Sequence, residues 1–363
     1  MDKSFQLMIV LAVVSGTIAG HLLLNQSPKL EVIFPGRSDF ANACTQKSKG
    51  RTWKEVRLDT VVSISNYDGK PLLEPLRVKV GQNDYIYVLD IYAPGVLKFS
   101  QSGNFVQLYG KGKGEGPGEF ELPHDFSVNS SGDVFVCDPR TGLVTVFDVK
   151  GNVKLTARTK GLPSYVVAFN DGSFVIVQDG IGPMFQKYDP RGNFNSEFGN
   201  FLEKQSTYAM PLDALIASSG EGFCGGFFWA GFIYSYDKTG NQKYLCETID
   251  KYPLPKFDIT QTRQENKITT HISPSKDAPL SALDVSVDDS LLYVLAAGAS
   301  KKEGAVVMDA YKASSGKYLY SFKFRKLPGT EGIRSTVVRR GYLYTCEYLQ
   351  NGGTIIRKYK LTF

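Results

Sequence analysis

Short runs of alternating apolar and polar residues recur along the chain from residue 75 onwards, each directly or closely behind a proline. Strict alternation over a few residues predicts a strand with one buried face. The prolines that introduce these runs are separated by 48, 40, 48, 68 and 49 residues, and they are Pro75, Pro123, Pro163, Pro211, Pro279 and Pro328. The pattern therefore predicts a repeated unit that opens with a strand.

Each unit continues with further strand-like runs. The second is rich in aromatic and β-branched residues, as in DYIYVLD, GDVFVCD and SLLYVLAA. In five of the units a third run leads into a glycine-centred turn, as in VTVFDVKGN and IYSYDKTGN, and an outer strand follows. Four short strands per unit, in six units with turn residues between them, predict an all-β fold, namely a six-bladed β-propeller.

The two ends of the repeat region fit together. The sixth unit contains three strands and finishes with TIIRKYKLTF, whereas residues 52–64 (TWKEVRLDTVVSI) form a strand-like run that belongs to no other unit. An N-terminal strand that completes the last blade would remove the open sheet edges, which otherwise favour aggregation. We therefore expect residues 52–363 to form one closed propeller.

Residues 108–152 (LYGKGKGEGPGEFELPHDFSVNSSGDVFVCDPRTGLVTVFDVKGN) show a glycine-rich lead, a Pro, an aromatic strand ending in Asp and an aromatic-Asp-x-x-Gly turn. This segment resembles an NHL-type repeat, and the resemblance implies a six-bladed propeller of the NHL type. Asp90 and Asp138 match the NHL aspartate, and we expect them to bond the backbone of the following turn. The resemblance does not transfer an activity, because one fold hosts many functions.

The N-terminal segment, residues 1–24, is strongly apolar. Phe5 to Leu24 contains no Asp, Glu, Lys or Arg, and a helix of that length would cross the hydrocarbon core of a membrane. This predicts an uncleaved transmembrane anchor, with a cleaved signal peptide ending near Ala19 as the alternative. Residues 25–51 are expected to be a tether. The anchor, and what NHL-like anchored propellers imply, favour an extracytoplasmic propeller at the periplasmic or cell surface.

The charge and the cysteine content argue against several classes of function and of structural site. Lys and Arg number 42 against 36 acidic residues, a net charge of +6 that is spread along the chain. Nucleic-acid binders concentrate their basic residues, so no nucleic acid is expected as a partner. The five cysteines are odd in number and lack CxxC spacing, which argues against a disulfide framework and a zinc knuckle. We expect Cys137, Cys224 and Cys346 to be small apolar residues within strands.

The first residues of the six inner strands should meet at one mouth of the central channel. These candidate binding residues are Arg77, His124, Asp125, Ser164, Asp213, Ser281 and Arg334. Their mixed charge favours a non-catalytic scaffold that binds a peptide, glycan or protein partner, with no cofactor. The alternative is a hydrolase or lactonase whose divalent metal, such as calcium, is held by Asp125 and Asp213.

The longest departure from the repeat falls between the fourth and fifth units. Residues 250–278 are polar and lack strand-like alternation. Long loops in compact domains are often functional. We therefore expect a lid or a partner-docking loop at the same mouth.

Overall fold

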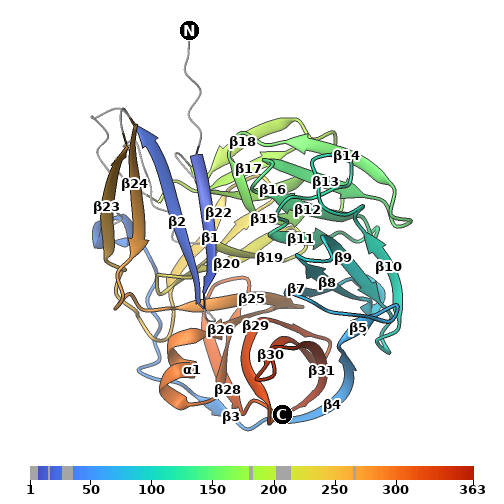
Figure 1. Cartoon of the computed structure of the whole chain (residues 1–363). Coiled ribbons are helices and arrows are strands. Elements are labelled where there is room, and N and C mark those ends of the chain that lie inside the picture. Colours follow the sequence, from blue (N-terminus) through green and yellow to red (C-terminus); the bar gives the residue numbers. More distant parts are fainter. Residues whose placement is uncertain (1–6, 15–16, 27–35, 180–182, 202–213, 265–266) are drawn as a thin grey trace.

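The inner strands expected behind the six prolines all form, and each begins a sheet of four antiparallel strands, to which a short parallel strand is added in one blade, so the fold is a six-bladed β-propeller (Figure 1). The structure is a computed structural model that describes residues 7–14, 17–26, 36–179, 183–201, 214–264 and 267–363. The blades are numbered 1 to 6 in chain order from residue 75.

Blades 1 to 3 follow the predicted repeat closely. Their strands, from the channel outwards, are β7 (Pro75–Val80), β8 (Ile86–Asp90), β9 (Gly95–Phe99) and β10 (Phe105–Tyr109) in blade 1; β11 (Asp125–Val128), β12 (Val134–Asp138), β13 (Leu143–Phe147) and β14 (Val153–Arg158) in blade 2; and β15 (Leu162–Ala168), β16 (Phe174–Asp179), β17 (Phe185–Tyr188) and β18 (Phe194–Phe198) in blade 3.

Blades 4 to 6 complete the ring. Their strands are β19 (Ala214–Ser218), β20 (Gly222–Phe227), β21 (Phe232–Asp237) and β22 (Gln242–Glu247) in blade 4; β25 (Ala282–Asp288), β26 (Leu291–Ala296), β27 (Val306–Lys312), β28 (Tyr318–Phe324) and the short parallel strand β3 (Trp53–Lys54) in blade 5; and β29 (Thr330–Arg339), β30 (Tyr342–Leu349), β31 (Thr354–Thr362) and β4 (Arg57–Ile64) in blade 6.

The N-terminal strand β4 closes the ring. It lies antiparallel beside β31, with Ile64 opposite Ile356 and Arg57 opposite Thr362. This is the pairing that the missing fourth strand of the last unit predicts. It covers the outer edge of β31 and joins the two ends of the propeller in one sheet.

The short elements outside the blades are few. Within the described ranges these are two 3₁₀ turns, η1 (Arg37–Phe40) and η2 (Gln82–Asp84), one helix, α1 (Ala297–Glu303), and a two-stranded ribbon of β5 (Asn66–Tyr67) and β6 (Lys70–Pro71). The helix sits between β26 and β27 of blade 5 (Figure 1).

The aspartates that end β8 and β12 hold the turns around them. Each buried carboxylate accepts four backbone N–H groups. Asp90 accepts two from residues 73 and 74, which lead into its blade, and two from residues 92 and 93 in the turn ahead. Asp138 does the same with residues 121, 122, 140 and 141. The expected turn role is confirmed, and each aspartate also ties the lead segment of its blade to the second strand.

An N-terminal strap, residues 36–52, runs over blades 4 and 5. Its buried anchor is Phe40, which stacks on Phe232 with ring centroids 4.4 Å apart and meets Phe227 edge-on at 6.1 Å. The sequence predicts a tether here, but over the described residues it is docked on the propeller. The difference follows from Phe40, whose burial among other aromatic rings is strongly favourable.

A disulfide links the strap to blade 4. Cys44 is bonded to Cys246 on β22, 202 residues away in sequence, and the N–H of Cys44 donates to the carbonyl of Leu245 at 2.8 Å. The expectation that the chain has no disulfide framework is therefore wrong for this pair, because spacing along the sequence does not reveal which strands meet. Cys137, Cys224 and Cys346 are free and buried in strands, as predicted.

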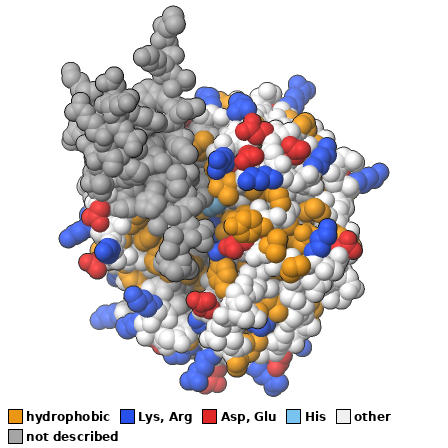
Figure 2. Space-filling view, viewed as in Figure 1, with side chains coloured by type: hydrophobic (Ala, Val, Ile, Leu, Met, Phe, Trp, Pro, Cys, Tyr) orange, Lys and Arg blue, Asp and Glu red, His pale blue; other side chains and the backbone are white. Residues whose placement is uncertain are grey.

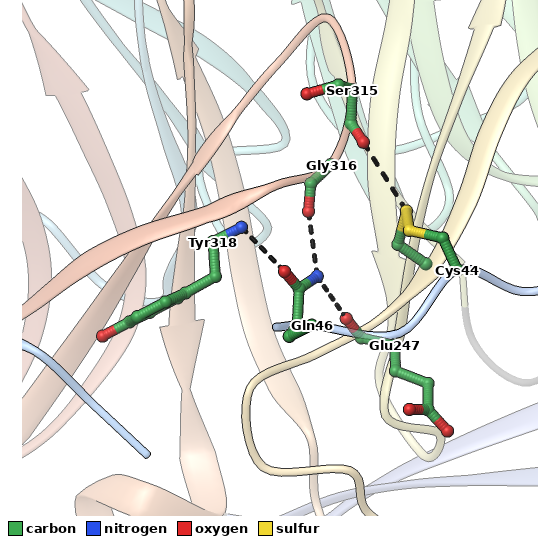
Figure 3. Close-up of a disulfide and its surroundings, with 7 residues drawn as sticks. Cys44, Gln46, Glu247, Ser315, Gly316 and Tyr318 are labelled. Carbon is green, nitrogen blue, oxygen red and sulfur yellow. Dashed lines mark hydrogen bonds between the residues drawn. A yellow bond between two sulfur atoms is a disulfide. The ribbon is translucent and has the colours of Figure 1, made fainter. Parts of the chain in front are cut away.

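Gln46 continues the strap from blade 4 to blade 5 (Figure 3). Its Nε2 donates to the carbonyls of Glu247 at 2.7 Å and Gly316 at 2.9 Å. Its Oε1 accepts the N–H of Tyr318 at 2.8 Å. Because one buried amide satisfies backbone groups of two blades, it fixes blades 4 and 5 side by side.

Arg51 makes the second bridge of the strap. Its guanidinium donates to both carboxylate oxygens of Asp250 at 2.5 Å and to both of Asp309 at 2.8 and 2.9 Å. Asp309 lies on β27 and its side chain is 2% exposed. The strap then passes into β3, which pairs with β28.

The apolar N-terminal segment differs from the prediction. Its described parts form strands β1 (Leu7–Val14) and β2 (Thr17–Gln26) instead of one helix, and no helix within the described ranges is long and apolar enough to span a bilayer. The sequence offers a reason, since Ile9, Val10, Val13 and Ile18 are β-branched and favour strands.

Residues 250–278 are also more ordered than expected. They contain the antiparallel strands β23 (Phe257–Gln264) and β24 (Lys267–Pro274), and β24 pairs with β2 in a sheet of order β1-β2-β24-β23. This sheet is separate from the blades (Figure 1). The prediction of a loop was wrong. It rested on the lack of alternating apolar and polar residues, but the Thr and Ile residues of this stretch favour strands by their β-branched side chains.

Candidate functional site

The inner strands surround a cavity in the central channel. Its volume is about 310 Å³, and its lining contains residues of all six inner strands, β7, β11, β15, β19, β25 and β29. Because each blade contributes its innermost strand in the same direction, one end of the channel collects the starts of these strands and the other collects their ends.

The cavity opens where the inner strands end. Its lining begins at the middle of the channel with Arg77 and Asp125, and it extends to residues of the following hairpins, among them Gln82, Asn129 and Asn170. The candidate mouth predicted from the sequence lies at the opposite end, where the inner strands start.

The predicted site residues divide into three groups. Arg77 and Asp125 line the cavity. His124, Ser164, Ser281 and Arg334 are buried and do not line it. Asp213 lies outside the described residues. A binding role for these residues stays a prediction.

The buried group forms contacts within the protein. His124 donates from Nδ1 to the carbonyl of Ser164 at 2.6 Å, and its ring meets Tyr165 edge-on at 5.3 Å. Tyr165 in turn accepts a hydrogen bond from Nη2 of Arg77 at 2.9 Å. A chain of side chains thus connects the predicted mouth to the inner end of the cavity.

Arg334 and Ser281 are held in other ways. Nη1 of Arg334 donates to Oε1 of Glu74 at 2.6 Å, and its guanidinium lies 4.2 Å from the ring centroid of Tyr348. The N–H of Ser281 donates to the carbonyl of Phe228 at 2.7 Å. The contacts of both residues therefore join neighbouring segments of the ring.

Two carboxylates in the cavity wall join neighbouring inner strands. Asp125 on β11 accepts Nζ of Lys79 at 2.8 Å and the N–H of Val166 on β15 at 3.1 Å. Asp284 on β25 accepts the hydroxyl of Ser335 at 2.7 Å and the N–H of Thr336 on β29 at 2.8 Å. Both carboxylates have structural partners from the next blade.

The same connection recurs two residues further along each strand. The hydroxyl of Ser127 accepts the N–H of Ala168 at 3.0 Å, and that of Ser286 accepts the N–H of Val338 at 3.1 Å. Because residues i and i+2 of a strand share a face, an acid followed by a serine at this spacing joins blade 2 to blade 3 and blade 5 to blade 6.

Metal-ligating side chains are not grouped in the part of the chain that the structure describes. Within it, no three His, Cys, Asp or Glu residues are placed to hold a metal ion. Of the two carboxylates in the metal hypothesis, Asp125 is paired with Lys79, and Asp213 is outside the described ranges.

The pKa of His124 is shifted strongly. Burial and the nearby charge of Arg77 lower it from 6.5 to about 4, although the hydrogen bond to Ser164 and the charge of Asp125 oppose the shift. A carbonyl can only accept, so Nδ1 carries the proton of a neutral ring. His124 is therefore an uncharged hydrogen-bond donor at neutral pH.

This shift predicts an acid-sensitive propeller. Between pH 6.5 and 4 the unfolded chain binds a proton at His124 and the folded chain does not, so stability falls as the pH falls. Lowering the pH from 7.5 to 5 should remove about 2 kcal/mol through this residue alone. His124→Gln keeps a donor for Ser164 and should lose less stability over the same range, measured by urea unfolding. Parallel profiles of the two proteins would contradict the assignment.

Several residues of the cavity were not anticipated. Lys79, Tyr165, Asp284, Ser335 and Arg339 line it as well. The signal was present in the sequence, because Arg77 and Lys79 stand two residues apart on one strand. Following each inner strand to its end, instead of stopping at its first residues, would have found them.

The basic residues form no stripe on the face seen in Figure 2. Lys and Arg side chains lie mainly towards its edge, with a few nearer the middle, where hydrophobic side chains gather. This distribution agrees with the even spread of basic residues along the sequence.

Comparison with known families and structures agrees with the architecture. A family described as "6-bladed beta-propeller" matches residues 66–186, which extend from the β5–β6 ribbon before blade 1 into blade 3. The fold is shared. No curated protein matches the chain. The family match and the structure both give six blades, and the narrower NHL-type label stays a prediction.

Solved structures with the same fold are distant in sequence. A protein of Bacteroides fragilis described as exported is 12% identical, with a TM-score of 0.56 over 89% of this chain and 99% of that one. A member of the DUF4221 family from Bacteroides vulgatus is 12% identical, with a TM-score of 0.53 over 86% and 99%. A catalytically inactive virginiamycin B lyase from Staphylococcus aureus, with quinupristin, is 13% identical, with a TM-score of 0.50 over 85% and 100%. At such identities the likeness shows the fold alone.

Proposed function

We propose that the protein is a non-catalytic, extracytoplasmic binding module that takes a small ligand, or the end of a peptide or glycan, into its central channel. The observation that carries the proposal is the cavity of about 310 Å³ lined by all six inner strands. Such a volume is at the lower end of the range of small-molecule sites. A closed ring presents this cavity without refolding, because every wall is a strand of a different blade.

The proposed entrance differs from the mouth predicted from the sequence. Four of the predicted residues at that mouth are buried and bonded to the protein, whereas the lining of the cavity reaches the hairpins at the other end. The ligand is therefore proposed to enter where the inner strands end.

Two observations support the extracytoplasmic part of the proposal. The Cys44–Cys246 disulfide is typical of an oxidising compartment. One structure with the same fold is described as an exported protein.

A pair of tryptophan substitutions tests the channel and its entrance. Ser218 is exposed, ends β19 and lines the cavity, whereas the exposed Leu327 lies before β29 at the opposite mouth. With the full chain and a panel of amino acids, dipeptides and monosaccharides, we expect at least one compound to raise the melting temperature of the wild type. Leu327→Trp should keep this shift, and Ser218→Trp should lose it.

The reverse result would place the site at the start of the inner strands. No shift with any compound in the wild type would count against a small-ligand channel. The same assay distinguishes the alternative, a metal-dependent hydrolase or lactonase. A stoichiometric calcium ion whose removal with EDTA lowers the melting temperature would favour that alternative.

A further inference from the structure

Arg77 is a buried cation in the cavity wall. The residue is 3% exposed, and its Nη2 donates to the neutral hydroxyl of Tyr165 at 2.9 Å. Among the described residues, no carboxylate oxygen lies within ion-pairing distance of its guanidinium, and its Nε has no hydrogen-bond partner. Burial lowers the pKa of Arg77, but nearby groups that include Asp284 and Asp125 raise it above its ordinary value, so these carboxylates act on the charge at longer range without forming an ion pair.

Other largely buried arginines of this chain are paired. Arg51 binds Asp250 and Asp309, Arg334 binds Glu74, and Arg357 binds Glu347. A buried charge without a partner is strongly unfavourable. Arg77 departs from this pattern at the point where the chain has a cavity.

The carboxylates nearest to Arg77 along the cavity wall are already engaged. Asp125 holds Lys79 and a backbone N–H of β15, and Asp284 holds Ser335 and a backbone N–H of β29. Each carboxylate thus joins two neighbouring inner strands and forms no ion pair with Arg77. The guanidinium therefore keeps hydrogen-bond donors that an anion from outside the chain could use.

A second cation stands nearer the entrance. Arg339 ends β29, lines the same cavity and has no ion pair with a carboxylate of the described chain, and its Nε is also buried without a partner. With Lys79, the cavity has three cations against the two carboxylates, a surplus of one positive charge. Such a surplus attracts anions into a cleft.

The remaining wall is mainly polar. Ser127, Asn129, Asn170 and Ser218 line it, whereas aliphatic residues of the inner strands such as Val78 are buried in the cores between blades. Hydroxyl and amide groups of this kind fix the orientation of small organic molecules by hydrogen bonds. A simple inorganic anion on Arg77 would leave most of them without a contact.

We propose that the channel cavity binds a small polar carboxylic acid, with its carboxylate on the guanidinium of Arg77 and its remaining polar groups against the hydroxyl and amide side chains of the wall. The inference rests on the proposed binding function and names its ligand class. Arginine suits this role because its planar guanidinium donates two parallel hydrogen bonds to a carboxylate.

Matched acids and amides test the proposal. Binding of glycolate and N-acetylglycine to the full chain is measured by calorimetry against glycolamide, N-acetylglycinamide and inorganic phosphate. We expect each acid to bind at least tenfold more tightly than its amide and than phosphate, as for a hydrogen bond between charged groups. Arg77→Gln should remove the preference for the acid.

Two further variants keep the test decisive if Arg77→Gln fails to fold. Arg339→Gln should weaken the acids severalfold. Arg340→Gln removes the same charge from the next residue, which binds Asp84 at 3.0 Å outside the cavity lining, and it should leave acid binding unchanged.

The outcomes separate the two proposals. Amides that bind as tightly as acids would overturn the carboxylate assignment and leave the channel as a binding site. Phosphate that binds as tightly as the acids would overturn the claim that the ligand is an organic acid. If no acid binds the wild type, the inference is wrong, and the compound panel with Ser218→Trp decides the proposed function separately.

Discussion

Reduction of the Cys44–Cys246 disulfide is expected to lower the free energy of unfolding by about 3–5 kcal/mol. The cross-link joins residues 202 positions apart, so it removes much of the freedom of the unfolded chain. In the folded state it fixes the strap to the outer strand of blade 4. Urea unfolding of the wild type with and without a reductant measures the effect.

The double variant Cys44→Ala/Cys246→Ala is the control. It should unfold at the lower urea concentration of the reduced wild type, and a reductant should then change nothing. A thiol count in denaturant gives an independent check, because only Cys137, Cys224 and Cys346 should react before reduction. Five reactive thiols in the purified, unreduced protein would contradict the disulfide.

Arg51→Met is expected to destabilise the propeller by about 3–5 kcal/mol, as for the loss of one partner from a buried ion pair. Burial raises the pKa of Asp309, and Arg51 opposes this rise. Without the arginine, Asp309 must stay charged and unpaired or bind a proton. The variant should therefore lose less stability than the wild type when the pH is lowered. Urea unfolding at pH 7 and pH 5 measures both effects.

Arg57→Met is the matched control. Arg57 also pairs with an aspartate, Asp59, but their side chains are 79% and 48% exposed. Such a surface pair contributes at most about 1 kcal/mol. Adding Asp309→Asn to Arg51→Met should recover part of the loss, because the unpaired buried charge is then gone. Equal losses in Arg51→Met and Arg57→Met would contradict the bridging role of Arg51.

The blades could be predicted from the sequence because their determinants are local. A proline, an alternating strand and a glycine turn mark each unit, and the spacing alone gives the number of blades. The closure by β4 could also be predicted, because the last unit lacks a fourth strand and the strand-like run of residues 52–64 belongs to no other unit. The role of Asp90 followed from the preference of Asp for turns.

The contacts between segments that are distant in the sequence could not be predicted. Nothing near Cys44 indicates that Cys246 is its neighbour, and nothing near Gln46 or Arg51 indicates which blades they join. The apolar N-terminal run could be interpreted as a helix or as strands, because length and hydrophobicity suit both. In the structure, β2 pairs with β24, a partner that lies more than 200 residues further along the chain.

The candidate site was predicted in part. Arg77 and Asp125 were named and do line the cavity. The binding mouth stays a prediction, because the packing at either end depends on side chains such as His124 and Tyr165 that meet from different blades. That Arg77 lacks a carboxylate partner could not be deduced either, since Asp284 stands near enough in the ring to be a candidate until its bonds to β29 are known.

The position of the disulfide has a consequence for the order of assembly. During synthesis, the strap and β4 emerge before the blades, but the partner of β4 is β31 of blade 6, which is made after blades 1 to 5. Until then β4 is an unpaired strand of the kind that promotes association between chains. Cys246 is available once blade 4 has emerged, so the disulfide can fix the strap before blades 5 and 6 exist. The disulfide would then hold the unpaired β4 close to the place where blade 6 folds.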